Sequence, residues 1–189
     1  GQKLMGAIDN ASGISVILET ARKLNVEAKK KVFKDDIVIV AYNAEETGLN
    51  GSNEFMKKYN KKYNKYYNIN IDCVGAKNCM ELAMGNNDVK SEKLYSAMRE
   101  LFNEEGVAYN DNIYATKNGV LRGTSDHQIF RMYGYPSLVL GDDNIIDIVH
   151  TNNDNLDNID YSDLEKLSEV LFKFISENFY DMNEIKTGN

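Results

Sequence analysis

The stretch "IVIVAYNAEETGLNGS", residues 37–52, joins an apolar, β-prone run to two adjacent glutamates. The run Ile37–Tyr42 shows no polar alternation, which is typical of a strand buried on both faces of a parallel sheet. Glu45 and Glu46 follow directly after the expected end of that strand. A solvated loop would explain them, since glutamate is mostly exposed in proteins. The alternative is that the two acids belong to a functional site, and the rest of the sequence has to decide.

Strands and amphipathic helices alternate on both sides of this stretch. Further strands are predicted at residues 67–72, 80–84 and 137–140, and helices at residues 14–24, 52–63, 94–102 and 162–175. Ser52 is expected to cap the second helix, and Ser162 with Glu165 has capping-box spacing for the last. The alternation predicts one α/β domain over residues 1–189, with three α/β/α layers and a mostly parallel, mixed sheet.

Composition excludes several classes of partner. The net charge is −7 without a Lys/Arg stripe, which disfavours binding to nucleic acid or anionic lipid. No apolar run approaches the roughly 20 residues of a membrane span, and no signal segment is visible. Cys73 and Cys79 are too few for a disulfide framework and are expected to be free thiols. With only two histidines, His127 and His150, any metal site must use carboxylates.

Acidic residues follow the ends of several predicted elements. Ligands of such sheets bind beyond the carboxyl ends of the strands. Glu45, Glu46 and Asp72 follow strands, His150 follows the last strand after a loop, and Asp9 precedes the first helix. Clustered carboxylates repel one another, and a divalent cation removes that repulsion. Carboxylates with an imidazole suit zinc, with manganese or cobalt as alternatives.

Each of these residues also has an ordinary structural explanation. Asp9 could cap the following helix, Asp72 could be a strand-end turn residue, and His150 could be a loop histidine; their joint placement favours a shared site. Adjacent side chains point in different directions, so one of Glu45 and Glu46 is expected to bind metal and the other to take a proton from water.

Four motifs, in order, resemble the M28 family of zinc metallopeptidases. They are "GAIDNASG" with "ILETAR", "AYNAEETGLNGS", "NINIDCVG", and "GTSDHQIF" with "YGYPSLVL" leading to "VHTNNDNLDNID". The resemblance spans about residues 6–170. It implies a zinc-peptidase fold and a hydrolase that removes N-terminal residues from peptides with a free N-terminus. It also implies an extracellular or cell-envelope location.

The resemblance also assigns roles to residues. Asp9 would bridge two zinc ions, Asp72 would bind one ion, and Glu46 with His150 would bind the other. Glu45 would be the general base. The peptide bond Asp9–Asn10 would be cis. His127 is expected to lie near the site without binding metal, with Asp126 capping a short helix. Cys73 is expected to point into packing, and Tyr and Met side chains from residues 109–135 to shape a substrate pocket.

One departure from the family pattern sets further expectations. The family's first zinc ligand is a histidine in an H-x-D motif upstream of the bridging aspartate, and residues 1–8 contain no such motif. We therefore expect a C-terminal portion of the peptidase domain without its first strands. Such a chain is expected to bind at most one zinc tightly, to have little or no activity, and to self-associate through an exposed sheet edge.

Two other functions stay open. The first is an inactive peptidase-like binding or structural module. The second is a di-zinc hydrolase or cyclase that acts on another amide, such as a carboxypeptidase, a deacylase or a glutaminyl cyclase.

Overall fold

A computed structural model describes residues 4–77, 80–83, 89–110, 124–142 and 145–180. Its helices are α1 (Gly13–Glu27), α2 (Asn50–Tyr59), α3 (Glu92–Glu105), α4 (His127–Met132) and α5 (Tyr161–Ser176). Its strands are β1 (Asn68–Ile71), β2 (Met80–Ala83) and β3 (Ser137–Asp142). Cys79 and Met84 lie outside the described residues.

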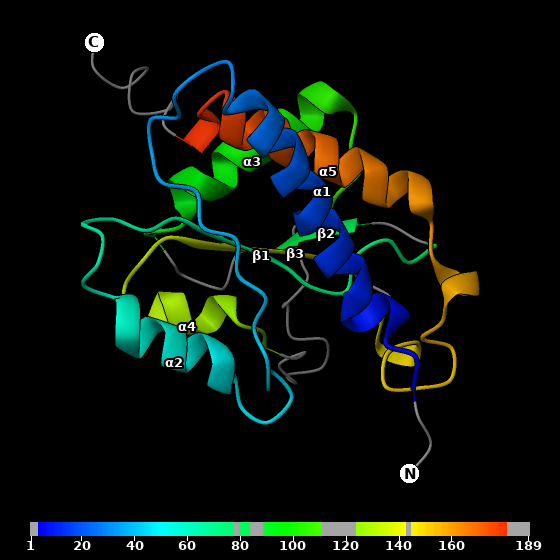
Figure 1. Ribbon diagram of the computed structural model, residues 1–189. Coiled ribbons are helices and arrows are strands. Elements are labelled where there is room, and N and C mark those ends of the chain that lie inside the picture. Colours follow the sequence, from blue (N-terminus) through cyan, green and yellow to red (C-terminus); the bar gives the residue numbers. More distant parts are fainter. Residues whose placement is uncertain (1–3, 78–79, 84–88, 111–123, 143–144, 181–189) are drawn as a thin grey trace.

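The strands form a small mixed sheet in the order β1-β3-β2. β1 runs parallel to β3, with Asn68 opposite Ser137, and β2 runs antiparallel to β3. All six residues of β3 are buried, as expected for a central apolar strand. Helices α1, α3 and α5 lie on one side of the sheet and α2 and α4 on the other (Figure 1). The three-layer α/β/α prediction is therefore confirmed.

The apolar run Ile37–Tyr42 does not form the predicted strand. Residues 36–42 run as an extended segment without strand pairing, and this light-blue segment passes β1 without joining the sheet (Figure 1). The side chains of Ile37, Val38 and Ile39 are 36%, 50% and 42% exposed. The physical reason is that no described strand lies beside the run to satisfy its backbone groups, and a strand needs such a neighbour.

Both faces of the sheet carry an apolar layer. The larger packs α1, α3 and α5 against β1 and β3 around fully buried Phe102, Phe174 and Leu138. The smaller packs α2 and α4 around Met56 and Phe130. Truncating a buried phenylalanine to alanine typically lowers the free energy of unfolding by about 3–5 kcal/mol. These two layers therefore stabilise the sheet, including the rim where the acidic residues lie.

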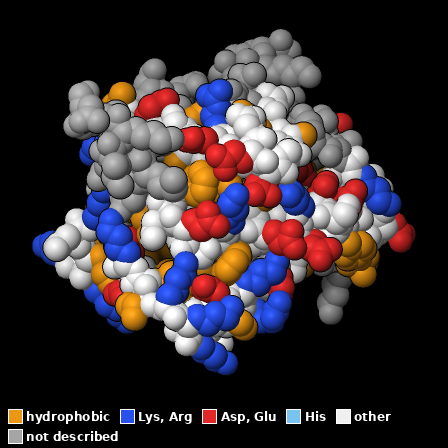
Figure 2. Space-filling view, turned by 90° about the horizontal axis from the view of Figure 1, so that it is seen from above, with side chains coloured by type: hydrophobic (Ala, Val, Ile, Leu, Met, Phe, Trp, Pro, Cys, Tyr) orange, Lys and Arg blue, Asp and Glu red, His pale blue; other side chains and the backbone are white. Residues whose placement is uncertain are grey.

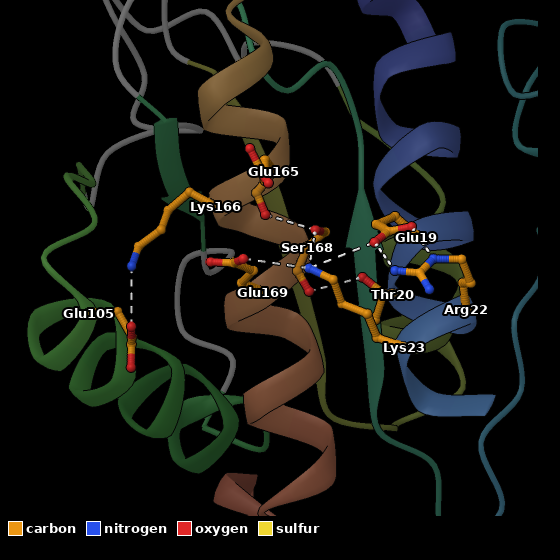
Figure 3. A network of polar contacts seen from close by, with 9 residues as sticks. All are labelled: Glu19, Thr20, Arg22, Lys23, Glu105, Glu165, Lys166, Ser168 and Glu169. Atoms are coloured by element: carbon orange, nitrogen blue, oxygen red, sulfur yellow. Dashed lines mark hydrogen bonds and ion pairs between the residues drawn. The ribbon is translucent and has the colours of Figure 1, made fainter. Parts of the chain in front are cut away.

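Helix α1 is fixed to α5 by polar contacts as well as apolar ones (Figure 3). The Thr20 hydroxyl donates to the Ser168 carbonyl at 3.4 Å, and Lys23 Nζ donates to Ser168 Oγ at 3.1 Å. On the other side of α5, Lys166 pairs with Glu105 of α3 at 3.2 Å. Because α1 follows directly from the turn that contains Asp9, this docking fixes the position of Asp9.

The two predicted helix caps are wrong. Ser52 is buried inside α2, where its hydroxyl donates to the Leu49 carbonyl at 3.1 Å, and Leu49 occupies the cap position. α5 is capped by Asp160, whose carboxylate accepts the backbone N–H of Ser162 at 3.0 Å. Asp at this position satisfies the free amides of the first turn as well as Ser does. α2 also ends at Tyr59, earlier than predicted.

The outer face of the α1, α3 and α5 layer mixes basic and acidic side chains (Figure 2). No described helix has both the length and the apolarity needed to cross a membrane.

Candidate metal centre

Asp9 lies in a kinked helical turn that precedes α1. The turn spans Ala7–Ser12, with non-helical backbone at Asp9 and Asn10 and a cis peptide bond between them. The carboxylate of buried Asp154 accepts the Ile8 N–H at 2.6 Å and the Asp9 N–H at 3.4 Å. The cis bond confirms the expectation from the resemblance. The hydrogen bonds from Asp154, which is distant in the sequence, fix the position of this turn.

Asn10 ties this turn to the end of β1. Its Nδ2 donates to the Ile71 carbonyl at 2.9 Å, and its Oδ1 accepts the N–H groups of Gly13 at 3.1 Å and Cys73 at 3.3 Å. One side chain therefore joins the turn, the start of α1 and the strand end that carries Asp72. The side chains of Asp9 and Asp72 are brought to the same rim of the sheet.

The structure brings Asp9, Glu46 and His150 together. His150 Nε2 lies 2.6 Å from Glu46 Oε1 and 3.1 Å from Asp9 Oδ2. One ligand atom from each of the three residues falls within 4.8 Å of the others. The Glu46 and His150 side chains are 59% and 62% exposed and that of Asp9 is 21% exposed. The hydrogen bond to Glu46 is the main cause that raises the pKa of His150.

Asp72 forms the more enclosed half of the cluster. Ser125 Oγ donates to Asp72 Oδ2 at 2.6 Å, and Asn70 Nδ2 donates to Ser125 Oγ at 2.7 Å. Cys73 Sγ lies 3.4 Å from Asp72 Oδ1, and ligand atoms of Asp9, Asp72 and Cys73 fall within 4.8 Å of one another. Two carboxylates and one thiol therefore make up this half.

Cys73 has two environments, so the expectation that it points only into packing is incomplete. The residue is buried in a small apolar cluster with Ile8 and Ile159, as expected. Its sulfur nevertheless approaches the Asp72 carboxylate. A left-handed backbone at Cys73, with φ of 57°, breaks the strict alternation of side chains that the prediction assumed. Burial, followed by the charges of Asp72 and Asp9, raises the pKa of the thiol.

Glu45 lies beside the cluster and its surroundings are acidic. Burial and the charges of Asp72, Glu46, Asp126 and Asp9 raise its pKa to about 7. Burial and the charges of Asp72 and Glu46 also raise the pKa of Asp9 to about 6. Such shifts mark carboxylates crowded together without enough positive charge, which is the condition that a bound cation relieves.

Backbone strain concentrates around these side chains. Ala44, just before the two glutamates, and His150 both have φ of 60°, a left-handed conformation that is rare for residues with a Cβ. Strain of this kind persists where the surroundings impose it, and it is common at functional sites. The loops at the rim are therefore held in conformations that aim the acids and the imidazole.

Sequence reasoning missed several residues that position the site. Asp154, Ser125 and Asn10 all stand inside the quoted motifs without an assigned role, and each bonds to Asp9, to Asp72 or to the turn around them. Their pairing joins segments far apart in the chain, which local spacing cannot reveal. The sequence offered one signal for them: each is a polar residue that lies inside one of the quoted motifs and has no assigned role.

The expectations for Asp126 and His127 are corrected in part. Asp126 precedes α4, but its side chain makes no capping hydrogen bond. It is 7% exposed, and its Oδ1 has no hydrogen-bond partner among the described residues. His127 is buried, and burial lowers its pKa to about 4; it belongs to neither of the two groups of potential metal ligands in the described chain. Of the expected substrate pocket, residues 111–123 lie outside the described part.

The donor set of Asp9, Glu46 and His150 fits zinc. Catalytic zinc sites commonly use three protein ligands drawn from histidine and carboxylates. Burial and the neighbouring carboxylates raise the pKa of Asp9 and of Glu45, which is consistent with a site that a cation would stabilise. The Asp9–Asp72 half offers two carboxylates and a buried, protonated thiol, which is a poorer fit.

Comparison with known proteins gives a family and several relatives. The family described as "Peptidase family M28" matches residues 1–175. Aminopeptidase YwaD of Bacillus subtilis is 29% identical over 181 residues, which cover 91% of this chain and 37% of that protein.

Solved structures agree with this match. A zinc aminopeptidase from Bacillus subtilis is 27% identical with a TM-score of 0.71, covering 92% of this chain and 42% of that one. The LapA aminopeptidase of Legionella pneumophila shares the fold with a TM-score of 0.76 at 23% identity, covering 94% of this chain and 47% of that one. The chain thus spans less than half the length of each of these relatives.

Proposed function

The chain belongs to peptidase family M28, and from this premise we propose that the whole protein is a zinc-dependent aminopeptidase. The observation that carries the proposal is the meeting of Asp9, Glu46 and His150, with Glu45 beside them. The names of the relatives, aminopeptidases and a zinc aminopeptidase, support the same reaction and metal.

In this proposal Asp9, Glu46 and His150 would hold zinc, and Asp72 together with Asp9 would be available to a second ion. When bound, zinc supplies Lewis-acid polarisation of a carbonyl group and a lower pKa for water. Beside such an ion Glu45, whose pKa is otherwise raised to about 7, would be ionised and could accept a proton.

Glu45 acts as the general base. It takes a proton from the attacking water and passes a proton to the leaving amine, the two transfers that hydrolysis of a peptide bond requires. Glu45 suits this role better than Glu46, because Glu46 Oε1 is already bonded to His150 at 2.6 Å. Ser125 and Asn70 hold the orientation of Asp72 while Asp154 and Asn10 hold that of Asp9.

The substrate class is supported by the names of the relatives, which are aminopeptidases. A peptide with a free N-terminus carries a positive α-amine, which a carboxylate at the rim that the metal leaves uncompensated would attract. A blocked N-terminus lacks that charge. We therefore propose removal of N-terminal residues over cleavage of internal or blocked amides.

The test uses the full-length protein loaded with zinc. We expect hydrolysis of leucine p-nitroanilide, strongly reduced hydrolysis of its N-acetylated analogue, loss of activity with EDTA, and recovery on adding zinc. Equal hydrolysis of the acetylated substrate would point to another amide reaction. Zinc binding without any hydrolysis of either substrate would favour the inactive binding module.

A further inference from the structure

Basic side chains are concentrated in two short segments of this acidic chain. Residues 28–34 and 55–71 contain no acidic residue, and nine of the chain's 22 basic residues lie in them, which leaves 13 basic residues against 29 acidic ones elsewhere. All nine are exposed. We call them the basic face; they are Lys29, Lys30, Lys31, Lys34, Lys57, Lys58, Lys61, Lys62 and Lys65.

The two segments of the basic face lie side by side in the fold. Tyr180 joins them, because its hydroxyl donates to Asp35 Oδ2 at 2.8 Å and its ring centroid lies 5.2 Å from that of Tyr67. Asp35 directly follows the first segment, and Tyr67 lies within the second. Both segments pass the left side of the molecule in Figure 1. The basic face is therefore one region of the surface.

Flanking acids neutralise only part of this charge. Four acidic residues flank the two segments: Glu27, Asp35, Asp36 and Glu54. Lys30 pairs with Glu27 at 3.0 Å, and Lys57 pairs with Glu54 at 2.6 Å. Exposed ion pairs of this kind contribute little to stability, so an anionic partner can compete for these lysines. Nine lysines against four acids leave the region positive.

The side chains between the lysines suit a lipid interface better than a nucleic acid. Val32 is 97% exposed, with lysines before it and Phe33 after it. Lysine ammonium groups lie over the rings of Tyr59 at 5.1 Å and Tyr63 at 5.0 Å, where a nucleic-acid base would stack. The basic face also contains no arginine, the residue that most often reads guanine. Tyrosine and apolar side chains flanked by lysine are typical of membrane interfaces.

The basic face lies far from the acid cluster. Helix α2 has ten residues, about 15 Å, and leads from the loop of Glu45 and Glu46 to the second lysine segment. Strand β1 then leads from this segment to Asp72. Both elements therefore have acids at one end and the basic face at the other. A protein that rests on its basic face holds the acids away from an anionic surface, beyond the Debye length of about 8 Å at physiological salt.

We propose that the basic face binds the surface of an anionic phospholipid membrane, without crossing it. The lysines lie at the lipid phosphates, and Val32 and Phe33 enter the headgroup region. The proposal departs from the expectation drawn from the net charge, because the distribution of charge, and not its sum, decides what one face attracts. The proposal does not depend on the proposed catalytic function.

The test measures co-sedimentation of the protein with vesicles of phosphatidylcholine that contain about one third phosphatidylglycerol. EDTA is present, so that no metal ion can bridge the acid cluster to the lipid. We expect binding at about 0.1 M salt and its loss at about 1 M, where the Debye length is only about 3 Å. Vesicles of phosphatidylcholine alone should bind at least tenfold more weakly.

Two double variants of equal net charge locate the binding. Lys61→Glu with Lys62→Glu changes the basic face, whereas Lys77→Glu with Lys93→Glu changes two exposed lysines outside it. The first pair should weaken binding at least about 30-fold, since each lysine near an anionic membrane contributes roughly fivefold. The second pair is the matched control and should stay within about threefold of the parent. Circular dichroism checks that both variants fold.

A further variant distinguishes a membrane from a soluble polyanion. Val32→Asn removes an apolar side chain but no charge, so it should weaken vesicle binding at least about threefold and leave the binding of long-chain polyphosphate unchanged. Absence of vesicle binding, or equal losses in the two double variants, would overturn the proposal. Tight polyphosphate binding together with unchanged vesicle binding by Val32→Asn would assign the basic face to a soluble polyanion instead.

Discussion

The two halves of the acid cluster share Asp9 but differ in what they offer a metal ion. The Glu46–His150 half supplies a carboxylate and an imidazole within hydrogen-bond distance of each other, both more than half exposed. The Asp72 half supplies one carboxylate held by Ser125 and a buried thiol whose pKa is raised. The difference teaches that proximity alone does not make a metal site, because the donor atoms must also be available in their unprotonated form.

The largest expected effect concerns Glu45, which belongs to neither half as a ligand. In the full-length protein, Glu45→Gln should lower kcat by roughly 10²- to 10⁴-fold, the usual contribution of a general base, while zinc content stays constant. Metal analysis of the purified variant checks the second part. Glu46→Gln is the matched control and should lose zinc; loss of zinc in Glu45→Gln would show that the two roles are exchanged.

The next effect separates the two halves directly. In the 189-residue chain, His150→Ala should weaken zinc binding by at least about 10- to 100-fold, a loss already seen when only a ligand's supporting partner is removed. Asp72→Asn keeps the size of the side chain and should weaken binding much less. Competition with a chromophoric chelator measures both. A larger loss for Asp72→Asn would reverse the ranking of the halves.

A third prediction concerns pH in the absence of metal. The pKa of Asp9 is raised to about 6 and that of Glu45 to about 7, so both bind protons more readily in the folded chain than when unfolded. Stability should therefore fall as pH rises from about 4 to about 7. His150, whose pKa is also raised, acts in the same direction.

The measurement is Tm by circular dichroism in EDTA at pH 5 and pH 8. We expect a lower Tm at pH 8, and zinc should remove most of the difference because it binds the folded state with its carboxylates ionised. Glu45→Gln should flatten the dependence. A Tm that rises from pH 5 to pH 8 in EDTA would contradict the crowding of the acids.

The smallest expected effect is at Cys73. Cys73→Ser should change zinc affinity by less than about threefold, or about 0.6 kcal/mol, because the buried thiol stays protonated. The cobalt-loaded parent chain should show no thiolate-to-cobalt charge-transfer band. Such a band, or a tenfold loss of affinity in the variant, would make Cys73 a ligand and the Asp72 half a three-donor position.

The sequence predicted the layers and the meeting of the acids because both depend on local patterns. Strand β3 and helices α1 and α5 follow from apolar spacing, and Asp9, Asp72 and His150 follow from their places next to a helix or after a strand. Glu46 joins them although the strand expected before it does not form. The prediction of a strand over Ile37–Tyr42 is wrong. A strand needs a neighbouring strand to pair with, and the local sequence pattern does not show whether one is present. Asp154 and Ser125 were missed because their partners are distant in the chain.

The most direct test of the unequal halves is anomalous scattering at the zinc edge from crystals of the 189-residue chain grown with zinc. We predict one well-occupied ion in each chain, bound by Asp9, Glu46 and His150. Two fully occupied ions in one chain, or a single ion bound by Asp72 without His150, would contradict the account.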